Sequence, residues 1–192
     1  MSISCGEKMS LRVIGGIAKG KRLKSRNVKH LRPATDYVKE ALFDILMHRV
    51  RGSLFLDLFA GSGSIGIEAL SRGAAKACFV ERDPLNAELI KENVAITGFM
   101  DQAQIYACDV RKALSMLSNK GDRFDLIFVD PPFRKGLIEP TLTKIWELAL
   151  PGADGLIITR SAKKEIIAVS KAPLRSERYG DSVLMFFSGD DC

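Results

Sequence analysis

The fold is decided by residues 54–70, which read Leu54-Phe55-Leu56-Asp57-Leu58-Phe59-Ala60-Gly61-Ser62-Gly63-Ser64-Ile65-Gly66-Ile67-Glu68-Ala69-Leu70. An apolar run ends in an acid, a glycine-rich turn follows, and an amphipathic segment comes next. This order predicts a buried strand, a tight loop and a helix N-terminus, the first half of a βαβ unit. Residues 61–66 match G-x-G-x-x-G, whose small residues let a ligand approach the backbone closely.

Asp57 indicates which ligand the glycine loop receives. Dinucleotide enzymes share the glycine pattern, but their loop amides bind a pyrophosphate, which a carboxylate at the end of the same strand would repel. The acid favours a ligand with positive charge, and S-adenosylmethionine has a sulfonium, an ammonium group and no phosphate. A P-loop is excluded because no Lys follows Gly66. A purely structural turn with a capping acid is the alternative.

The composition is that of a soluble globular protein. A chain of 192 residues predicts one domain, with room for a small appendage. No apolar run approaches the ~20 residues of a membrane span and no signal-peptide pattern opens the chain, so we expect a cytoplasmic protein without membrane contact. The four cysteines and two histidines lack metal-ligand spacing, which predicts reduced thiols and no metal.

Positive charge gathers in the first quarter of the chain. Residues 1–51 carry a net charge of +8 against +6 for the whole chain, which leaves −2 for the rest. Gly15-Gly16 between two short strand-like runs predicts a hairpin, which needs the main domain or a partner to cover it. Five cations follow the glycines: Lys19, Lys21, Arg22, Lys24 and Arg26. We expect residues 1–34 to form a basic arm that binds nucleic acid, with a solvated tail as the alternative.

Strand-like and helix-like segments alternate after residue 34. Strands are expected over 54–58, 75–80, 103–107, 124–129, 155–159, 166–170, 174–179 and 183–187. Helices are expected over 37–48, from Ser64 to about Arg72, 84–96, 110–117 and 136–150. The alternation predicts an α/β fold with a doubly wound, mostly parallel sheet over residues 35–192.

Two further acids stand at predicted strand ends. Glu81 comes 24 positions after Asp57, at the tip of the second strand, where it can accept hydrogen bonds from both ribose hydroxyls. Asp109 follows the third strand. It can accept from the adenine amino group or cap the next helix, and the sequence leaves both roles open.

A second chemical motif, Asp130-Pro131-Pro132-Phe133, follows the buried strand 124–129. Two consecutive prolines fix the backbone and remove two donors, which leaves carbonyls free between an acid and an aromatic ring. A planar base can stack on Phe133 while its exocyclic amine donates to Asp130 and a proline carbonyl. Such stacking contributes roughly 1–3 kcal/mol per base. A turn with a buried Phe is the alternative.

Together, Asp57–Gly63 and Asp130–Phe133 resemble the class I methyltransferases that modify exocyclic amines. The segment Leu31-Arg32-Pro33 with Thr35-Asp36, and the ending Tyr179-Gly180-Asp181, are similar to the bacterial family that methylates N2 of one guanine in 16S ribosomal RNA. The resemblance extends from about Leu11 to Phe187. It implies a Rossmann-like, seven-stranded sheet, S-adenosylmethionine as cofactor and 16S rRNA as partner, within an assembling small ribosomal subunit. We expect a monomer.

The resemblance also assigns residues. Those expected to act on the base are Asp130, Pro131, Pro132 and Phe133. Those expected to bind the cofactor are Asp57, Phe59, Gly61, Gly63, Glu81, Arg82, Asp109 and Val110. Those expected to bind RNA are Lys19, Lys21, Arg22, Lys24, Arg26, Arg32 and Arg134. The chain departs from the family at Ala34, usually Thr, at Lys39, usually Arg, and at Thr159-Arg160, where the family often has an acid.

Three other functions compete with this one. Methylation of adenine N6 or of a protein amide uses similar acid-proline-proline-aromatic sites, but residues 52–192 leave no separate domain for DNA recognition. An NAD-dependent oxidoreductase is disfavoured by Asp57 and by the lack of a proton-donor His. A non-catalytic RNA-binding module is disfavoured by the intact motif at 130–133.

Overall fold

Seven strands form one mixed sheet in a computed structural model that describes residues 11–26, 34–165 and 167–189. The strands are β1 (Leu54–Leu58), β2 (Lys76–Glu81), β3 (Ala103–Ala107), β4 (Phe124–Val129), β5 (Pro151–Ala162), β6 (Arg175–Tyr179) and β7 (Ser182–Ser188). Their order in the sheet is β3-β2-β1-β4-β5-β7-β6. The helices are α1 (Ala34–Leu46), α2 (Ser64–Ser71), α3 (Pro84–Thr97), α4 (Val110–Asn119) and α5 (Ile138–Glu147), with short 3-10 turns η2 (Met47–Arg49) and η3 (Met100–Gln102).

The first five strands are parallel, which brings their carboxyl ends to one edge. Leu58 of β1 lies beside Val80 of β2 and Val129 of β4, and Val129 in turn lies beside Thr159 of β5. β7 runs antiparallel to β5 and β6. The predicted doubly wound, mostly parallel seven-stranded sheet is therefore confirmed. Its switch between β1 and β4 marks the edge where such sheets bind ligands.

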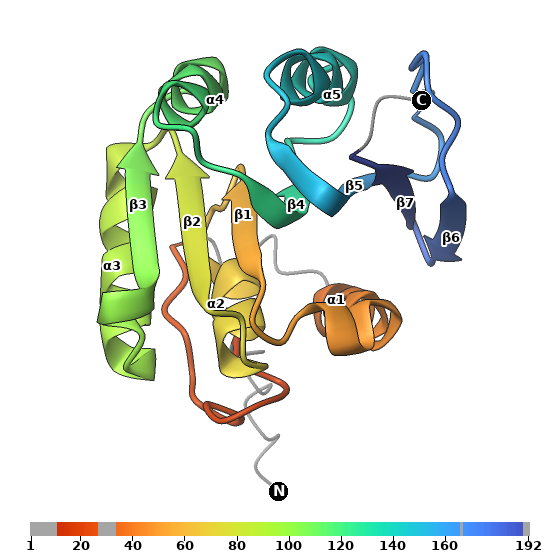
Figure 1. The fold of residues 1–192 in the computed structure, drawn as a ribbon. Coiled ribbons are helices and arrows are strands. Elements are labelled where there is room, and N and C mark those ends of the chain that lie inside the picture. The colour runs from red at the N-terminus through yellow and green to blue at the C-terminus, as the bar shows by residue number, and fades with distance from the viewer. Residues whose placement is uncertain (1–10, 27–33, 166, 190–192) are drawn as a thin grey trace, which may run out of the picture.

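Helices cover both faces of the sheet (Figure 1). Helices α4 and α5 lie on one face, and α1, α2 and α3 lie on the other. Each face has its own apolar core, and one strand contributes to both: Phe55 points to the α1–α3 side and Leu56 to the α4–α5 side. Burial on both faces explains why the central strands read as continuous apolar runs.

The segment 11–26 packs on the α1–α3 side rather than standing apart. Leu11, Val13 and Leu23 are buried in the same core as α1. The predicted hairpin is present as a short antiparallel pairing: Arg12 and Arg22 form a bridge, and Leu23 N–H donates to the Leu11 carbonyl at 2.7 Å. Its turn lies at residues 17–20, after the glycine pair. The glycine pair serves close contact instead: a Cβ on Gly16 would lie 1.8 Å from the carbonyl oxygen of Ser71 at the end of α2. The division at residue 34 stays a prediction.

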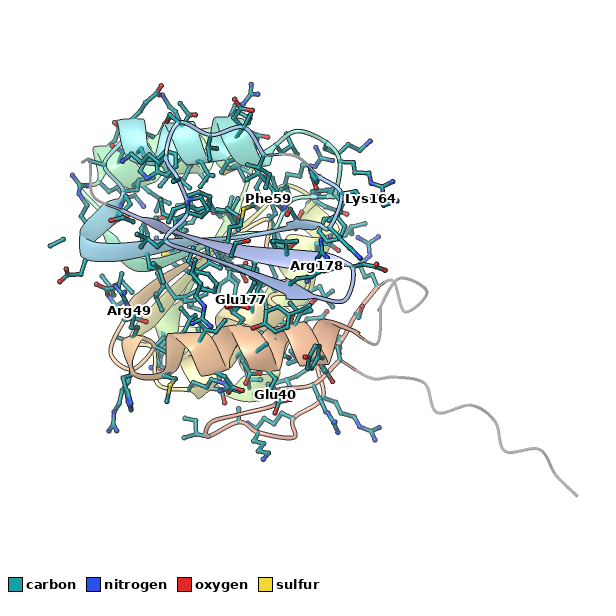
Figure 2. All side chains as sticks on the ribbon, turned by 90° about the vertical axis from the view of Figure 1, so that its right-hand side faces the viewer. Glu40, Arg49, Phe59, Lys164, Glu177 and Arg178 are labelled. Atoms are coloured by element: carbon teal, nitrogen blue, oxygen red, sulfur yellow. The ribbon has the colours of Figure 1, made fainter. Side chains whose placement is uncertain are left out.

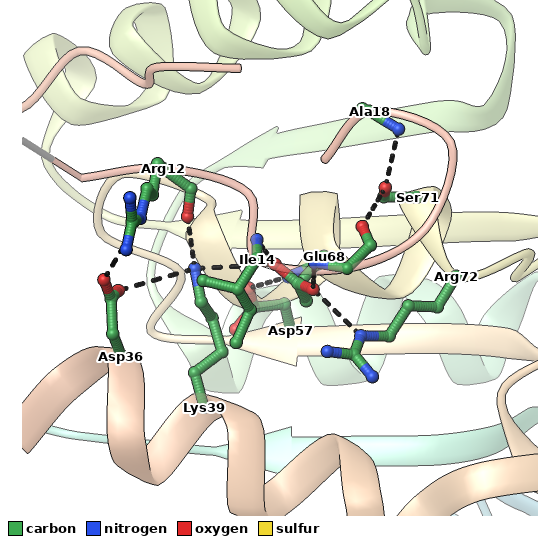
Figure 3. A network of polar contacts seen from close by, with 11 residues as sticks. Arg12, Ile14, Ala18, Asp36, Lys39, Asp57, Glu68, Ser71 and Arg72 are labelled. Atoms are coloured by element: carbon green, nitrogen blue, oxygen red, sulfur yellow. Dashed lines mark hydrogen bonds and ion pairs between the residues drawn. The ribbon is translucent and has the colours of Figure 1, made fainter. Parts of the chain in front are cut away.

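A buried polar network fixes this segment to the helices (Figure 3). The Glu68 carboxylate of α2 accepts hydrogen bonds from the backbone N–H of Ile14 and Gly15 and from Arg72 Nε, at 2.7–2.9 Å. Lys39 Nζ of α1 lies 3.5 Å from the same carboxylate and donates to the Arg12 carbonyl at 2.6 Å. Both oxygens of Glu68 are thus satisfied without water.

Two further expectations are corrected near the C-terminus. Residues 167–170 are not in a strand, and residue 166 lies outside the described residues. β5 spans twelve residues instead of five, because Pro151 already pairs with Phe124 of β4 and the antiparallel pairing with β7 continues to Ala162. Viewed onto β6 and β7, the molecule places Glu177 and Arg178 of β6 above Glu40 of α1 (Figure 2).

Within the described residues no helix is long and apolar enough to cross a bilayer, and no group of His, Cys, Asp and Glu has the arrangement of a metal site.

Candidate active site

A cavity of about 750 Å³ opens at the carboxyl ends of β1, β2, β4 and β5. Its volume falls in the range of small-molecule sites. Ten of the twelve residues predicted to bind cofactor or base line it: Phe59, Gly61, Glu81, Arg82, Asp109, Val110, Asp130, Pro131, Pro132 and Phe133. The fold therefore brings both predicted motifs, 73 residues apart from Asp57 to Asp130, to one cavity. The two that do not line it are Asp57 and Gly63.

Glu81 ends β2 with a nearly buried carboxylate. One oxygen accepts from Gly61 N–H at 2.8 Å, and the other accepts from Asp83 N–H at 2.9 Å. These bonds fix the carboxylate against the glycine loop. Each carboxylate oxygen has a second acceptor position, so Glu81 can still accept from the hydroxyl groups of a ribose in the cavity.

Asp109 is exposed and caps α4, since its Oδ1 accepts from Arg111 N–H at 2.9 Å. The capping role is thereby observed, and adenine binding stays a prediction. Asp109 also lines the cavity, so its capping role does not remove it from reach of a ligand there.

Asp57 stabilises the backbone of the glycine loop through a hydrogen bond. Its carboxyl is buried and accepts from Gly66 N–H at 3.0 Å. Burial raises the pKa of Asp57 to about 8, with smaller contributions from Asp130 and Glu81. The group is mostly protonated at neutral pH, so the repulsion of phosphate expected from an Asp57 carboxylate is weak here. Gly63 and Gly66 pack the loop tightly, because a Cβ on Gly66 would lie 2.3 Å from the Phe79 ring.

Asp130 directly follows β4 and faces Arg160 of β5. Arg160 Nε lies 3.3 Å from Asp130 Oδ1, and both side chains are 21% exposed. Burial raises the pKa of Asp130 to about 6, and Arg160 acts in the opposite direction. Asp130 is consequently ionised at neutral pH, whereas Asp57 is not.

The same Arg160 covers the aromatic residue of the motif. Its guanidinium carbon lies 5.3 Å from the centroid of the Phe133 ring, within cation–π range. Arg160 Nε is buried but has no partner in hydrogen-bonding geometry among the described residues. The acid and ring that were predicted to hold a base are therefore next to each other, and a cation from the neighbouring strand touches both.

Comparison with known proteins decides the family. The model of the family described as "Conserved hypothetical protein 95" matches residues 11–188. The chain belongs to this family. The "Ribosomal RNA small subunit methyltransferase D" of Escherichia coli K12 is 38% identical over 151 residues, covering 79% of this chain and 74% of that protein. The protein of the same name from Haemophilus influenzae is 36% identical over 173 residues and 89% of each chain.

A solved structure shows the same fold. A hypothetical protein of Thermus thermophilus is 34% identical, with a TM-score of 0.80 over 92% of this chain and 98% of that one. The prediction of a class I, S-adenosylmethionine-dependent methyltransferase of the ribosomal RNA methyltransferase family is thereby confirmed. The cavity fits that cofactor, because acids rather than a phosphate-binding loop lysine stand at the described strand ends that line it.

Some of the predicted RNA-binding cations already have partners within the protein, and others are exposed. Lys24 pairs with Glu92 at 2.9 Å, Arg26 pairs with Asp83 at 3.2 Å, and Lys21 Nζ donates to two carbonyls at the end of α3. Lys19 and Arg22 are exposed. Arg134 is exposed beside the cavity, and Arg32 lies outside the described residues. Their role in RNA binding stays a prediction.

Arg160 belongs to the site although no sequence motif predicts it. In the sequence, Thr159-Arg160 is visible only as a departure from the family, with no role implied for either residue. The available signal was positional: Arg160 follows the last parallel pair of β5, and that register places it beside the end of β4. The register of β4 and β5 could not be derived from the apolar runs alone.

Proposed function

We propose that this protein transfers a methyl group from S-adenosylmethionine to the exocyclic N2 amine of one guanine in 16S rRNA. It acts as a monomer in the cytoplasm, on RNA within the assembling small ribosomal subunit. The observation that carries the proposal is that an ionised Asp130 and the Phe133 ring both line the cofactor cavity and both adjoin Arg160. The curated relatives named for the small-subunit rRNA support the choice of substrate.

The residues in the cofactor half of the cavity would hold and orient S-adenosylmethionine. Glu81 accepts from the ribose, Asp109 from the adenine, and Gly61 keeps the loop backbone open to the ligand. Asp57 and Gly63 act indirectly, by fixing the loop from which Phe59 and Gly61 line the cavity. When bound, S-adenosylmethionine supplies a methyl group activated by its positively charged sulfur.

The base half makes a poor nucleophile reactive. The guanine N2 lone pair is delocalised into the ring, and a base flipped out of its stack can lie on Phe133. Hydrogen bonds from N2 to Asp130 and the Pro131 carbonyl favour a tetrahedral nitrogen, which localises the lone pair. Positive charge develops on N2 during transfer, so the Asp130 carboxylate stabilises the transition state more than the substrate.

No neutral-pH base is needed in this mechanism. The nitrogen becomes acidic once it has been methylated, so its proton can leave to water or to Asp130 after the transfer. This agrees with a cavity whose lining, among the described residues, contains carboxylates and cations but no histidine.

Nucleoside analysis tests the proposal. Purified protein and labelled S-adenosylmethionine are incubated with small subunits and with protein-free 16S rRNA from cells that lack the gene. We expect label in N2-methylguanosine of 16S rRNA, with subunits the better substrate. Label only in N6-methyladenosine, or only in protein, would contradict the proposal.

A further inference from the structure

The loops that follow β4 and β5 carry four exposed cations that the mechanism does not use. Arg134 and Lys135 follow the Asp130–Phe133 motif at the end of β4, and Lys163 and Lys164 follow β5. Among the residues that the structure describes, none of the four forms an ion pair. β4 and β5 are neighbours in the sheet, so the two pairs come close to each other and to the base-binding residues at the end of β4.

Glu165 joins the two loops. One carboxylate oxygen accepts from Arg134 N–H at 3.0 Å, and the other accepts from Ala162 N–H at 3.3 Å. The bond to Arg134 holds that residue at φ +60°, a conformation that is uncommon for a residue with a side chain. The second loop is also fixed to the β6–β7 turn, because Lys163 N–H donates to the Asp181 carbonyl at 2.8 Å.

The loops differ from the basic segment at the N-terminus. There, Lys21, Lys24 and Arg26 already have partners on α3 or at its start. The loop cations keep their charge available, and Figure 2 shows Lys164 pointing outward at the margin of the molecule, on the same side as Arg178. Available cations on anchored backbone suit phosphate binding, since little side-chain pairing must be broken first.

We propose that Arg134, Lys135, Lys163 and Lys164 form a phosphate clamp that holds the RNA backbone next to the target nucleotide, with Glu165 as the residue that positions its two halves. The inference rests on the proposed function only in taking RNA as the substrate. A nucleotide whose base enters the cavity leaves its two flanking phosphates at the mouth. The two loops lie next to each other where β4 and β5 end, since Glu165 bonds Arg134 N–H directly after Phe133.

Salt dependence of RNA binding tests the clamp. The probe is a fluorescent single-stranded RNA of about 12 nucleotides, measured by anisotropy between about 50 and 300 mM salt. The double variant Lys163→Gln with Lys164→Gln should lower the salt slope by about 1.4, because each lost contact with single-stranded RNA removes ~0.7. The control is Arg51→Gln with Lys76→Gln, which removes the same charge from exposed residues at the opposite edge of the sheet. It should leave the slope within about 0.3 of the wild type.

Glu165→Ala separates positioning from charge. Loss of a negative charge alone would tighten RNA binding, whereas loss of the link between the loops should weaken it several-fold. Unchanged melting temperature and unchanged affinity for S-adenosylhomocysteine serve as folding controls, and Glu165→Gln, which keeps both acceptor and shape in part, should bind with intermediate affinity.

Two results would overturn the clamp. One is a wild-type salt slope in the double lysine variant, and the other is tighter RNA binding by Glu165→Ala. Neither depends on which base is methylated, because neither measurement requires methyl transfer, and the salt slope reports phosphate contacts. A failure of guanine methylation with an intact difference in slope would refute the proposed function and leave the clamp standing.

Discussion

The carboxylates of Glu68 and Asp130 both have cationic partners, but they differ in how completely their hydrogen-bonding capacity is satisfied. Glu68 is fully buried and receives Ile14 N–H, Gly15 N–H, Arg72 and Lys39. Asp130 is partly exposed and faces one cation, whose buried Nε has no hydrogen-bond acceptor within the described part of the chain. The saturated network fixes structure, because nothing is left to bind a ligand. The unsaturated pair keeps bonding capacity for a substrate.

The largest effect on stability is expected from a substitution that breaks the hydrogen-bonded network around Glu68. Lys39→Ala should lower the free energy of unfolding by about 3 kcal/mol, since it removes one partner of a buried ion pair. Urea unfolding measures this. Lys91→Ala, which removes an exposed pair with Glu88, should cost less than about 1 kcal/mol. Equal losses in the two variants would mean that the network does not anchor segment 11–26.

Substitution of Phe133 tests the other region, the cavity around Asp130 that is left open to a substrate. Phe133→Ala should weaken capture of the base by roughly 1–3 kcal/mol, the contribution of one stacked base. In steady-state methylation, KM for the RNA substrate should rise and the affinity for S-adenosylhomocysteine should stay unchanged. A variant with wild-type KM would show that the base does not stack on Phe133.

Asp57 predicts a pH dependence of stability opposite to that of ordinary carboxylates. Its folded-state pKa, about 8, lies above the unfolded value of 3.8. The contribution of the protonated group is therefore complete below about pH 4 and is lost as the pH rises towards 8. Asp57→Asn should gain stability relative to the wild type between about pH 7 and 8, by at most about 1.4 kcal/mol. Melting curves across this range test the sign, and a relative loss would contradict it.

The smallest effect concerns Arg160. Asp130, with a pKa of about 6, must be ionised for transfer, so the single-turnover rate should fall below about pH 6. Arg160→Gln removes the cation that lowers this pKa and should move the acidic limb upward by about one unit. Lys144→Gln, at a cation that lines the cavity but pairs with Glu147, should not move it. Coincident limbs in the wild type and Arg160→Gln would refute the coupling.

The sequence predicted the features that a local residue pattern determines, namely the central strands and the loops that follow them. The apolar runs at 54–58 and 124–129 and the loops after them located both motifs, because strands buried on two faces and their carboxyl-end loops have local signatures. The neutral state of Asp57 could not be predicted, since it depends on burial by residues distant in the chain. The partners of Lys39 and Arg160 required the packing of α1 on α2 and the register of β4 with β5, which no local pattern encodes.

The most direct test of the account compares single-turnover methyl transfer by the wild type and Asp130→Asn. The substitution keeps the size of the side chain and removes the charge that stabilises the transition state. With unmethylated small subunits and saturating S-adenosylmethionine, we expect the rate constant to fall by roughly 10²–10³, with cofactor affinity nearly intact. A near wild-type rate of N2-methylguanosine formation by Asp130→Asn would contradict the mechanism.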